Sequence, residues 1–336
     1  MKYGLAPEDR EYFDQMGFLV APNVLSKGAV RDLLDAVDEV FRDSDRSSQW
    51  GSSTLYSERH EAAKSGRKEL RNAVARHPLM LELASNPTTL SLVTDLLGPN
   101  IKLRTTEVDV RPPMMRPTVI NEFGRGREGA PEQWHIDGPL YSFPDVDGIV
   151  PMMEVRVGFF LTDLRGPENG ALCVAAGTHK LDYRLLMDPD YRVPESCKYP
   201  VRVPAGSVVI FRTGLWHCTT PNFSELTRKV LYYAYTYRWV EPSDYIQQSP
   251  DLLARCTPLQ RQLLGAPITS DRHPLGEHPD KTPCSFYWFT RPEDLPIIEW
   301  RENLNAHDKG AIRDEAQSNH PSAASPDASL PTVAAR

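Results

Sequence analysis

The first hundred residues carry mostly helical patterns of apolar side chains. Residues 7–41 read as two helices around a short extended piece, and Ser26 can cap the second helix. The apolar positions of that helix recur with a helical period and form one face: Val30, Leu33, Leu34, Val37, Val40 and Phe41. A polar stretch at 44–68 follows, and a further helix is expected to start near Pro87 and stop at Gly98.

From about residue 101 to 240 the pattern changes to short extended runs separated by turn residues, which indicates β-strands. Residues 154–161 first alternate polar and apolar positions and then become wholly apolar, whereas residues 207–211 are mostly apolar after a turn at Gly206. The strand expected at 230–240 carries four tyrosines, which strand alternation should divide between core and pocket wall: Tyr232, Tyr233, Tyr235 and Tyr237. Antiparallel strands preceded by helices favour a β-sandwich or small open barrel with a helical buttress.

A helical pattern returns after residue 240, with Thr257 as a cap and Gly265 as a stop. We therefore expect one domain over residues 1–304. Its parts are a helical buttress at about 7–100, a β core at about 101–240 and a C-terminal helical segment at about 241–304. Residues 305–336 have few large apolar side chains and many Ser, Ala and Pro, which predicts a disordered tail.

Composition narrows the class of protein. The 336 residues include 38 Lys and Arg against 45 Asp and Glu, so the net charge is −7, and 40% hydrophobic residues suffice for a sizeable core. An acidic chain without a basic stripe predicts no nucleic-acid partner. The N-terminus lacks a signal-peptide pattern and no apolar run is long enough to span a membrane, so we expect a cytoplasmic protein. Five scattered cysteines indicate neither a disulfide scaffold nor a zinc ribbon.

The candidate chemistry centres on a His-x-Asp triplet and a distant histidine. His135 and Asp137 are two residues apart, so on a strand their side chains project to the same face. His217 follows 80 residues after Asp137 and can complete the set from a neighbouring strand. Two histidines and one carboxylate on one face leave positions open, the arrangement of non-haem Fe(II) sites that bind an organic cosubstrate and dioxygen.

A second His-x-Asp triplet shows that this short motif also arises by chance. His278-Pro279-Asp280 lies in a proline-rich stretch, and a proline does not supply a hydrogen bond inside a central strand. We interpret that copy as the chance match. Because two histidines and an aspartate also suit Zn(II) with a bound water, a zinc-dependent hydrolase stays open, as does a non-catalytic ligand-binding protein on the same barrel.

Residues after His217 favour the iron interpretation. Arg228 lies eleven residues beyond it, at the start of the last long strand, and Thr219 lies in the turn between them. A fixed guanidinium beside a metal site can hold a carboxylate with two charge-assisted hydrogen bonds, and a hydroxyl can add a third. This is what 2-oxoglutarate requires, because its 2-oxo acid end chelates iron while its far carboxylate is clamped.

The chain resembles the phytanoyl-CoA dioxygenase family of Fe(II)- and 2-oxoglutarate-dependent oxygenases from about residue 8 to 240, and more loosely to 300. The segments that carry the resemblance are Asp14-Gln15-Met16-Gly17-Phe18, Trp134-His135-Ile136-Asp137, Glu168-Asn169-Gly170, Gly177-Thr178-His179 and Trp216-His217 followed by Arg228. The family implies a double-stranded β-helix (jelly-roll) core with the metal inside its open end. Gln133 resembles a family position that contacts 2-oxoglutarate. His179 departs from the family pattern around it, and we expect it to satisfy a turn rather than bind metal.

The resulting hypothesis is a non-haem Fe(II)- and 2-oxoglutarate-dependent dioxygenase that uses O2 and releases succinate and CO2. His135, Asp137 and His217 would bind iron, and Arg228, Thr219 and Gln133 would bind the cosubstrate. Hydroxylation of an aliphatic C–H of a small molecule, in secondary metabolism, is the expected outcome. The loops at 44–68 and 111–131 are expected to cover the pocket, with the arginines of 111–127 solvated. The substrate's identity and the oligomeric state are not readable from the sequence.

Overall fold

The computed structural model describes residues 4–46, 67–114, 134–137, 147–188, 190–266, 268 and 292–315. Its first elements are the two expected helices around an extended piece: α1 (Pro7–Met16), β1 (Phe18–Ala21) and α2 (Lys27–Arg46). The predicted cap of α2 is confirmed, because the Ser26 hydroxyl accepts a hydrogen bond of 3.1 Å from the Ala29 amide. Helix α2 runs three residues into the predicted 44–68 loop, most of which lies outside the described residues.

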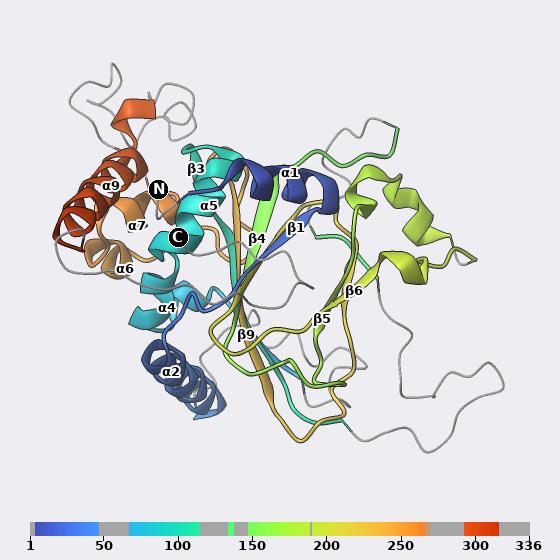
Figure 1. Cartoon of the computed structure of the whole chain (residues 1–336). Helices are drawn as coiled ribbons and strands as arrows, with labels where there is room; N and C mark the ends of the chain where they lie inside the picture. The colour runs from blue at the N-terminus through green and yellow to red at the C-terminus, as the bar shows by residue number, and fades with distance from the viewer. Residues whose placement is uncertain are drawn as a thin grey trace.

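The described strands form two antiparallel sheets (Figure 1). The six-stranded major sheet has the order β1-β7-β4-β9-β3-β2 and the three-stranded minor sheet the order β6-β5-β8. Their bounds after β1 are β2 Lys68–Arg71, β3 Ile101–Arg111, β4 Glu154–Phe160, β5 Leu172–Ala175, β6 Lys198–Val201, β7 Val208–Arg212, β8 His217–Thr219 and β9 Arg228–Tyr237. This arrangement confirms the predicted jelly-roll core.

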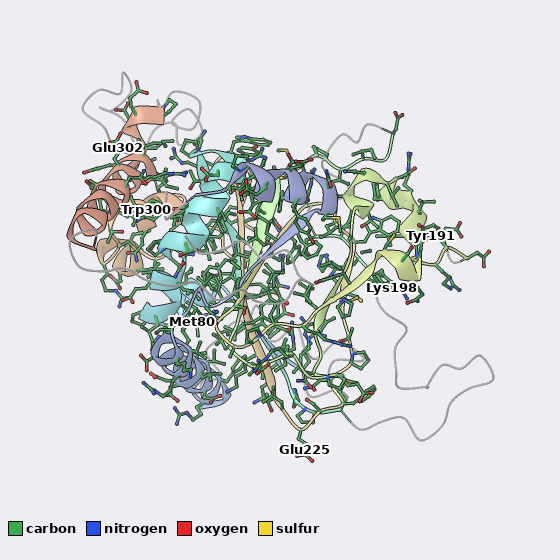
Figure 2. All side chains as sticks on the ribbon, in the orientation of Figure 1. Met80, Tyr191, Lys198, Glu225, Trp300 and Glu302 are labelled. Carbon is green, nitrogen blue, oxygen red and sulfur yellow. The ribbon has the colours of Figure 1, made fainter. Side chains whose placement is uncertain are left out.

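Alternate residues of the major sheet enter two different cores. On strand β9, Leu231, Tyr233 and Tyr235 pack with the helices, whereas Val230 and Tyr232 pack with residues of the minor sheet. Figure 1 shows most of the helices on the major sheet's outer face. Side chains fill the layer between these helices and the major sheet (Figure 2). Strand alternation therefore divides the tyrosines between two faces, as predicted, whereas a pocket wall on the inner face stays a prediction.

The remaining helices support the sheets from outside. Their bounds are α4 Pro78–Leu83, α5 Pro87–Leu97, α6 Pro250–Ala254, α7 Pro258–Leu263 and α9 Pro296–Glu315, with short 3-10 turns at Ala73–Ala75, Thr178–Lys180, Tyr183–Met187, Glu195–Cys197 and Pro292–Asp294. The predicted signals hold, since Gly98 ends α5 and Thr257 caps α7 with a capping box. No described helix is long and apolar enough to cross a membrane.

The last described helix overlaps the start of the tail expected at about 305–336. Helix α9 continues through residues 305–315, where a disordered tail was expected. This stretch has few large apolar residues, but its alanines and its lysine, arginine and glutamate are good helix formers that extend a helix already begun. Low apolar content therefore did not predict the end of the helix. Residues 316–336 lie outside the described part.

Candidate active site

Backbone pairing brings the three predicted metal ligands together. The segment 134–137 adds to the minor sheet through a β-bridge, in which His135 and His217 exchange backbone hydrogen bonds of 3.0 and 2.9 Å. Asp137, two residues further on, shares a face with His135. One ligand atom from each of these three side chains lies within 4.8 Å of the other two.

The His217 ring is held in the form that a metal ligand needs. Its Nδ1 lies 3.0 Å from the carbonyl oxygen of Leu215, and because a carbonyl only accepts, Nδ1 carries the hydrogen. The lone pair is therefore on Nε2, which lies 3.3 Å from Asp137 Oδ2. The Phe211 ring, 4.8 Å away between centroids, packs against the imidazole and fixes its plane.

Asp137 is held ionised in a largely buried position. Burial raises the pKa of this carboxyl, but the charge of Arg156, whose Nε lies 2.8 Å from Oδ2, opposes burial, and the pKa lies well below its usual range. No donor among the described residues is aligned for a hydrogen bond to Oδ2, although that atom is buried. An ionised, buried oxygen without an aligned donor fits a bound cation, so these residues suit a metal ion.

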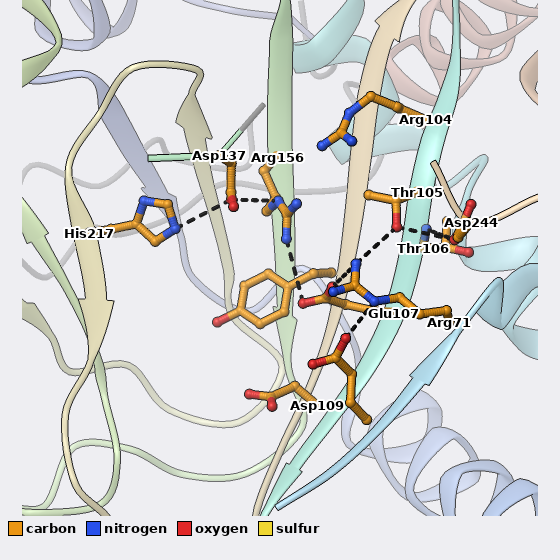
Figure 3. A network of polar contacts seen from close by, with 12 residues as sticks. Arg71, Arg104, Thr105, Thr106, Glu107, Asp109, Asp137, Arg156, His217 and Asp244 are labelled. Atoms are coloured by element: carbon orange, nitrogen blue, oxygen red, sulfur yellow. Dashed lines mark hydrogen bonds and ion pairs between the residues drawn. The ribbon is translucent and has the colours of Figure 1, made fainter. Parts of the chain in front are cut away.

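The sequence interpretation missed a buried network that continues from Asp137 (Figure 3). Arg156 on β4 also approaches Glu107 at 3.5 Å, and Glu107 pairs with Arg71 at 2.7 Å. Burial raises the pKa of Glu107, and Arg156 and Arg71 oppose this effect. The available signal was the alternation of charged with apolar residues along β3, where Glu107 and Asp109 share a face.

Arg228, the predicted cosubstrate residue, is completely buried at the start of β9. Its Nη1 donates a hydrogen bond to Asp109 and its Nη2 donates one of 2.8 Å to the Tyr232 hydroxyl, whereas its buried Nε has no acceptor among the described residues. A β-carbon at Gly170 would lie 3.3 Å from Arg228 Cδ, so a glycine there leaves room for the arginine's stem. A buried N–H without an acceptor fits an anionic ligand such as a carboxylate.

Asp109 keeps the surrounding arginines in a charged cluster. It pairs with Arg228, with Arg67 at 2.7 Å and with Arg111 at 2.8 Å. Burial raises the pKa of Asp109, but Arg111 and Arg228 outweigh it and hold the pKa below the usual range. The expectation of a solvated Arg111 in a loop is wrong, because Arg111 ends strand β3 and its pairing partner is buried inside the barrel.

Of the two other predicted cosubstrate residues, Thr219 and Gln133, the structure describes only Thr219. Thr219 lies two residues after His217 on β8, so both side chains share a face, and its neighbour across the sheet is Leu172 of the core between the sheets. Gln133 and the chance triplet at 278–280 lie outside the described residues, as does most of the predicted 111–131 loop. Their roles stay predictions.

His179 satisfies a turn, as predicted, rather than joining the metal ligands. Its Nε2 lies 3.2 Å from the carbonyl oxygen of Asp14, and its ring packs on Gly17, where a β-carbon would lie 2.6 Å from Nδ1. Gly17 has φ 86°, so it both ends α1 and makes room for this ring. Burial, supported by the charge of Arg212, lowers the pKa of His179 to about 4.

This shift predicts a pH-dependent loss of stability. The unfolded state binds a proton on His179 as the pH falls below 6.5, whereas the folded state resists protonation until about pH 4. Over that window the free energy of unfolding should fall by up to about 3 kcal/mol more in the wild type than in His179→Gln. Urea unfolding at pH 7 and pH 4.5 measures the difference, and equal acid losses in both proteins would contradict it.

A jelly roll that carries two histidines and a carboxylate between its sheets, with a buried arginine at the start of the last strand, defines the class of non-haem iron, 2-oxo acid-dependent oxygenases. The phytanoyl-CoA dioxygenase family matches residues 13–230, and the chain belongs to this family. The protein is an Fe(II)- and 2-oxoglutarate-dependent dioxygenase, as the sequence predicted.

Individual relatives agree with this class. A probable alpha-ketoglutarate-dependent hypophosphite dioxygenase from Stutzerimonas stutzeri is 22% identical over 249 residues, which cover 68% of this chain and 78% of the relative. Among solved structures, EctD from S. alaskensis with 2-oxoglutarate and 5-hydroxyectoine has a TM-score of 0.54 at 19% identity, covering 76% of this chain and 85% of its own. The carbocyclase SnoK from nogalamycin biosynthesis has a TM-score of 0.51 at 19% identity, covering 75% and 92%. These two structures are similar in fold.

Proposed function

We propose that this dioxygenase hydroxylates an aliphatic C–H of a small molecule, with His135, Asp137 and His217 as the iron ligands. The observation that carries the proposal is the convergence of their three ligand atoms within 4.8 Å, with the lone pair of His217 Nε2 directed to the same place as Asp137. Three ligands on one face leave positions for the 2-oxo acid group and for dioxygen.

Arg228 and Thr219 are the residues proposed to bind the far carboxylate of 2-oxoglutarate, with Gln133 as a further contact. Support comes from the buried Arg228 Nε, which has no acceptor within the described ranges, and from the position of Thr219 on the face that carries His217. A zinc hydrolase would leave Arg228 without a ligand to bind, although the pair with Asp109 gives Arg228 a structural partner under either interpretation. The unused Nε and the family membership favour the oxygenase.

The chain's own residues then prepare the reaction. Asp137 stays ionised beside Arg156, Leu215 fixes the His217 tautomer, and apolar side chains between the sheets keep water from the cosubstrate. Bound iron would supply the dioxygen chemistry, in which one oxygen atom enters the substrate C–H bond and the other enters succinate as 2-oxoglutarate loses CO2. The relatives are named for hypophosphite, ectoine and nogalamycin chemistry, so a small-molecule substrate is proposed here.

Anaerobic titration of the metal-free protein with Fe(II) and then 2-oxoglutarate tests the proposal. We expect a weak visible charge-transfer band that saturates with 2-oxoglutarate and is absent when Zn(II) replaces Fe(II). Admission of oxygen should then release succinate, which serves to screen candidate substrates. An iron-loaded protein that shows no band would contradict the cosubstrate site and return the zinc hydrolase and the binding protein to consideration.

A further inference from the structure

Tyr232 lies inside the barrel beside the proposed cosubstrate site. It faces the core between the two sheets, is 6% exposed, and its neighbour across the sheet on β4 is Gly158. A β-carbon on Gly158 would lie 2.8 Å from Tyr232 Cε1, so the glycine makes room for the ring. The Phe160 ring meets it edge to face at 6.4 Å between centroids. The ring is thus held in one place by its surroundings.

The Tyr232 hydroxyl has hydrogen-bonding capacity that the fold does not use. It accepts a hydrogen bond of 2.8 Å from Arg228 Nη2, but no group among the described residues accepts its own hydrogen. Burial raises the pKa of this phenol, with Arg228 opposing the effect, so the hydroxyl stays protonated at neutral pH. The Tyr232 hydroxyl can therefore donate a hydrogen bond to a ligand.

A second unused donor lies on the same pair of residues. Arg228 Nε is also buried without an acceptor in the described part of the chain. Leaving two buried donors unpaired is costly, because each loses its hydrogen bonds to water on folding without gaining a replacement. A carboxylate resolves both, because it has two oxygens that only accept.

Asp109 fixes the orientation of the Arg228 guanidinium beside Tyr232. It accepts from Arg228 Nη1, while Arg67 and Arg111 hold it from other sides. The guanidinium is thereby tied at Nη1 to Asp109 and at Nη2 to Tyr232. Its remaining Nε hydrogen and the Tyr232 hydroxyl are left for a third partner.

We propose that Tyr232 is a cosubstrate-binding residue whose hydroxyl donates a hydrogen bond to the far carboxylate of 2-oxoglutarate, beside Arg228. This inference rests on the proposed function and adds a residue that the sequence interpretation had divided only between core and pocket wall. Tyr232 thus contributes to the choice of a dicarboxylic over a monocarboxylic 2-oxo acid.

The experiment compares two tyrosine-to-phenylalanine variants of the same strand in the full-length protein. Tyr235 lies on the opposite face of β9 and donates to the Ala84 carbonyl oxygen at 2.8 Å, so Tyr235→Phe also loses one buried phenol hydrogen bond. In the anaerobic Fe(II) titration, Tyr232→Phe should weaken 2-oxoglutarate binding by about 10-fold. Tyr235→Phe should bind it like the wild type, and Fe(II) binding should be unchanged in both variants.

A shorter cosubstrate separates a direct contact from a structural effect. With 2-oxopentanoate, which lacks the far carboxylate, Tyr232→Phe and the wild type should bind equally. In an Arg228→Ala background, Tyr232→Phe should still weaken 2-oxoglutarate binding several-fold, because the hydroxyl contacts the ligand itself.

Three results would overturn the inference while leaving the proposed function intact. These are unchanged 2-oxoglutarate affinity in Tyr232→Phe, an equal loss for 2-oxoglutarate and 2-oxopentanoate, and no further loss in the Arg228→Ala background. A wild type that forms no band with iron and 2-oxoglutarate would instead overturn both.

Discussion

Asp137→Ala is expected to abolish turnover, with a loss of at least about 1,000-fold, and to weaken Fe(II) binding. The reason is that Asp137 is the only anionic member of the three-residue set, and its charge is held by Arg156 at 2.8 Å. Its removal leaves two imidazoles beside the buried Arg156 guanidinium, which keeps only the longer contact of 3.5 Å to Glu107, and that positive charge repels a metal cation. Iron content after dialysis and succinate release at saturating 2-oxoglutarate measure the two effects.

Asp163→Ala is the matched control for this variant. Asp163 is a half-exposed aspartate that also pairs with an arginine, Arg165, at 2.5 Å, but on the surface. Its loss should leave iron content and turnover within about twofold, because exposed ion pairs contribute little. Succinate release that persists in Asp137→Ala without an added anion would show that Asp137 is not a ligand.

The proposed ligand set was accessible from the sequence because its geometry is largely local. The spacing of His135 and Asp137 fixes a shared face on any extended segment, and only His217 required a long-range assumption. The β-bridge between His135 and His217 supplies that missing relation. The alternation of tyrosines on β9 was predictable for the same local reason.

The charged network could not be predicted in this way, because it depends on strand register. Glu107 meets Arg156 because β3 and β4 pair with opposite edges of β9, which brings together residues that are 49 positions apart in the chain. Arg111 was misplaced for a related reason: its sequence context is a loop with prolines, but β3 extends through it to reach its register partner Arg228. Strand order and register are long-range properties that residue patterns leave open.

Arg228→Ala is expected to weaken 2-oxoglutarate binding by about 100-fold, because it removes a buried, charge-assisted donor from the far carboxylate. Fe(II) binding should stay within about twofold, since Arg228 contacts Asp109 and Tyr232 and no member of the metal set. The fold should survive, because Asp109 retains Arg67 and Arg111 and is not left as an unpaired buried charge. The anaerobic charge-transfer band, titrated with 2-oxoglutarate, measures the loss.

The control for this variant is Arg184→Ala, which removes a half-exposed arginine that pairs with Asp182 at 2.8 Å. It should titrate like the wild type. Because 2-oxopentanoate lacks the far carboxylate, its affinity should be nearly equal in Arg228→Ala and the wild type, so the effect of Arg228 should be confined to the dicarboxylic acid. If 2-oxoglutarate saturates the band at the same concentration in Arg228→Ala as in the wild type, Arg228 serves only to neutralise Asp109. The carboxylate site must then be sought elsewhere between the sheets.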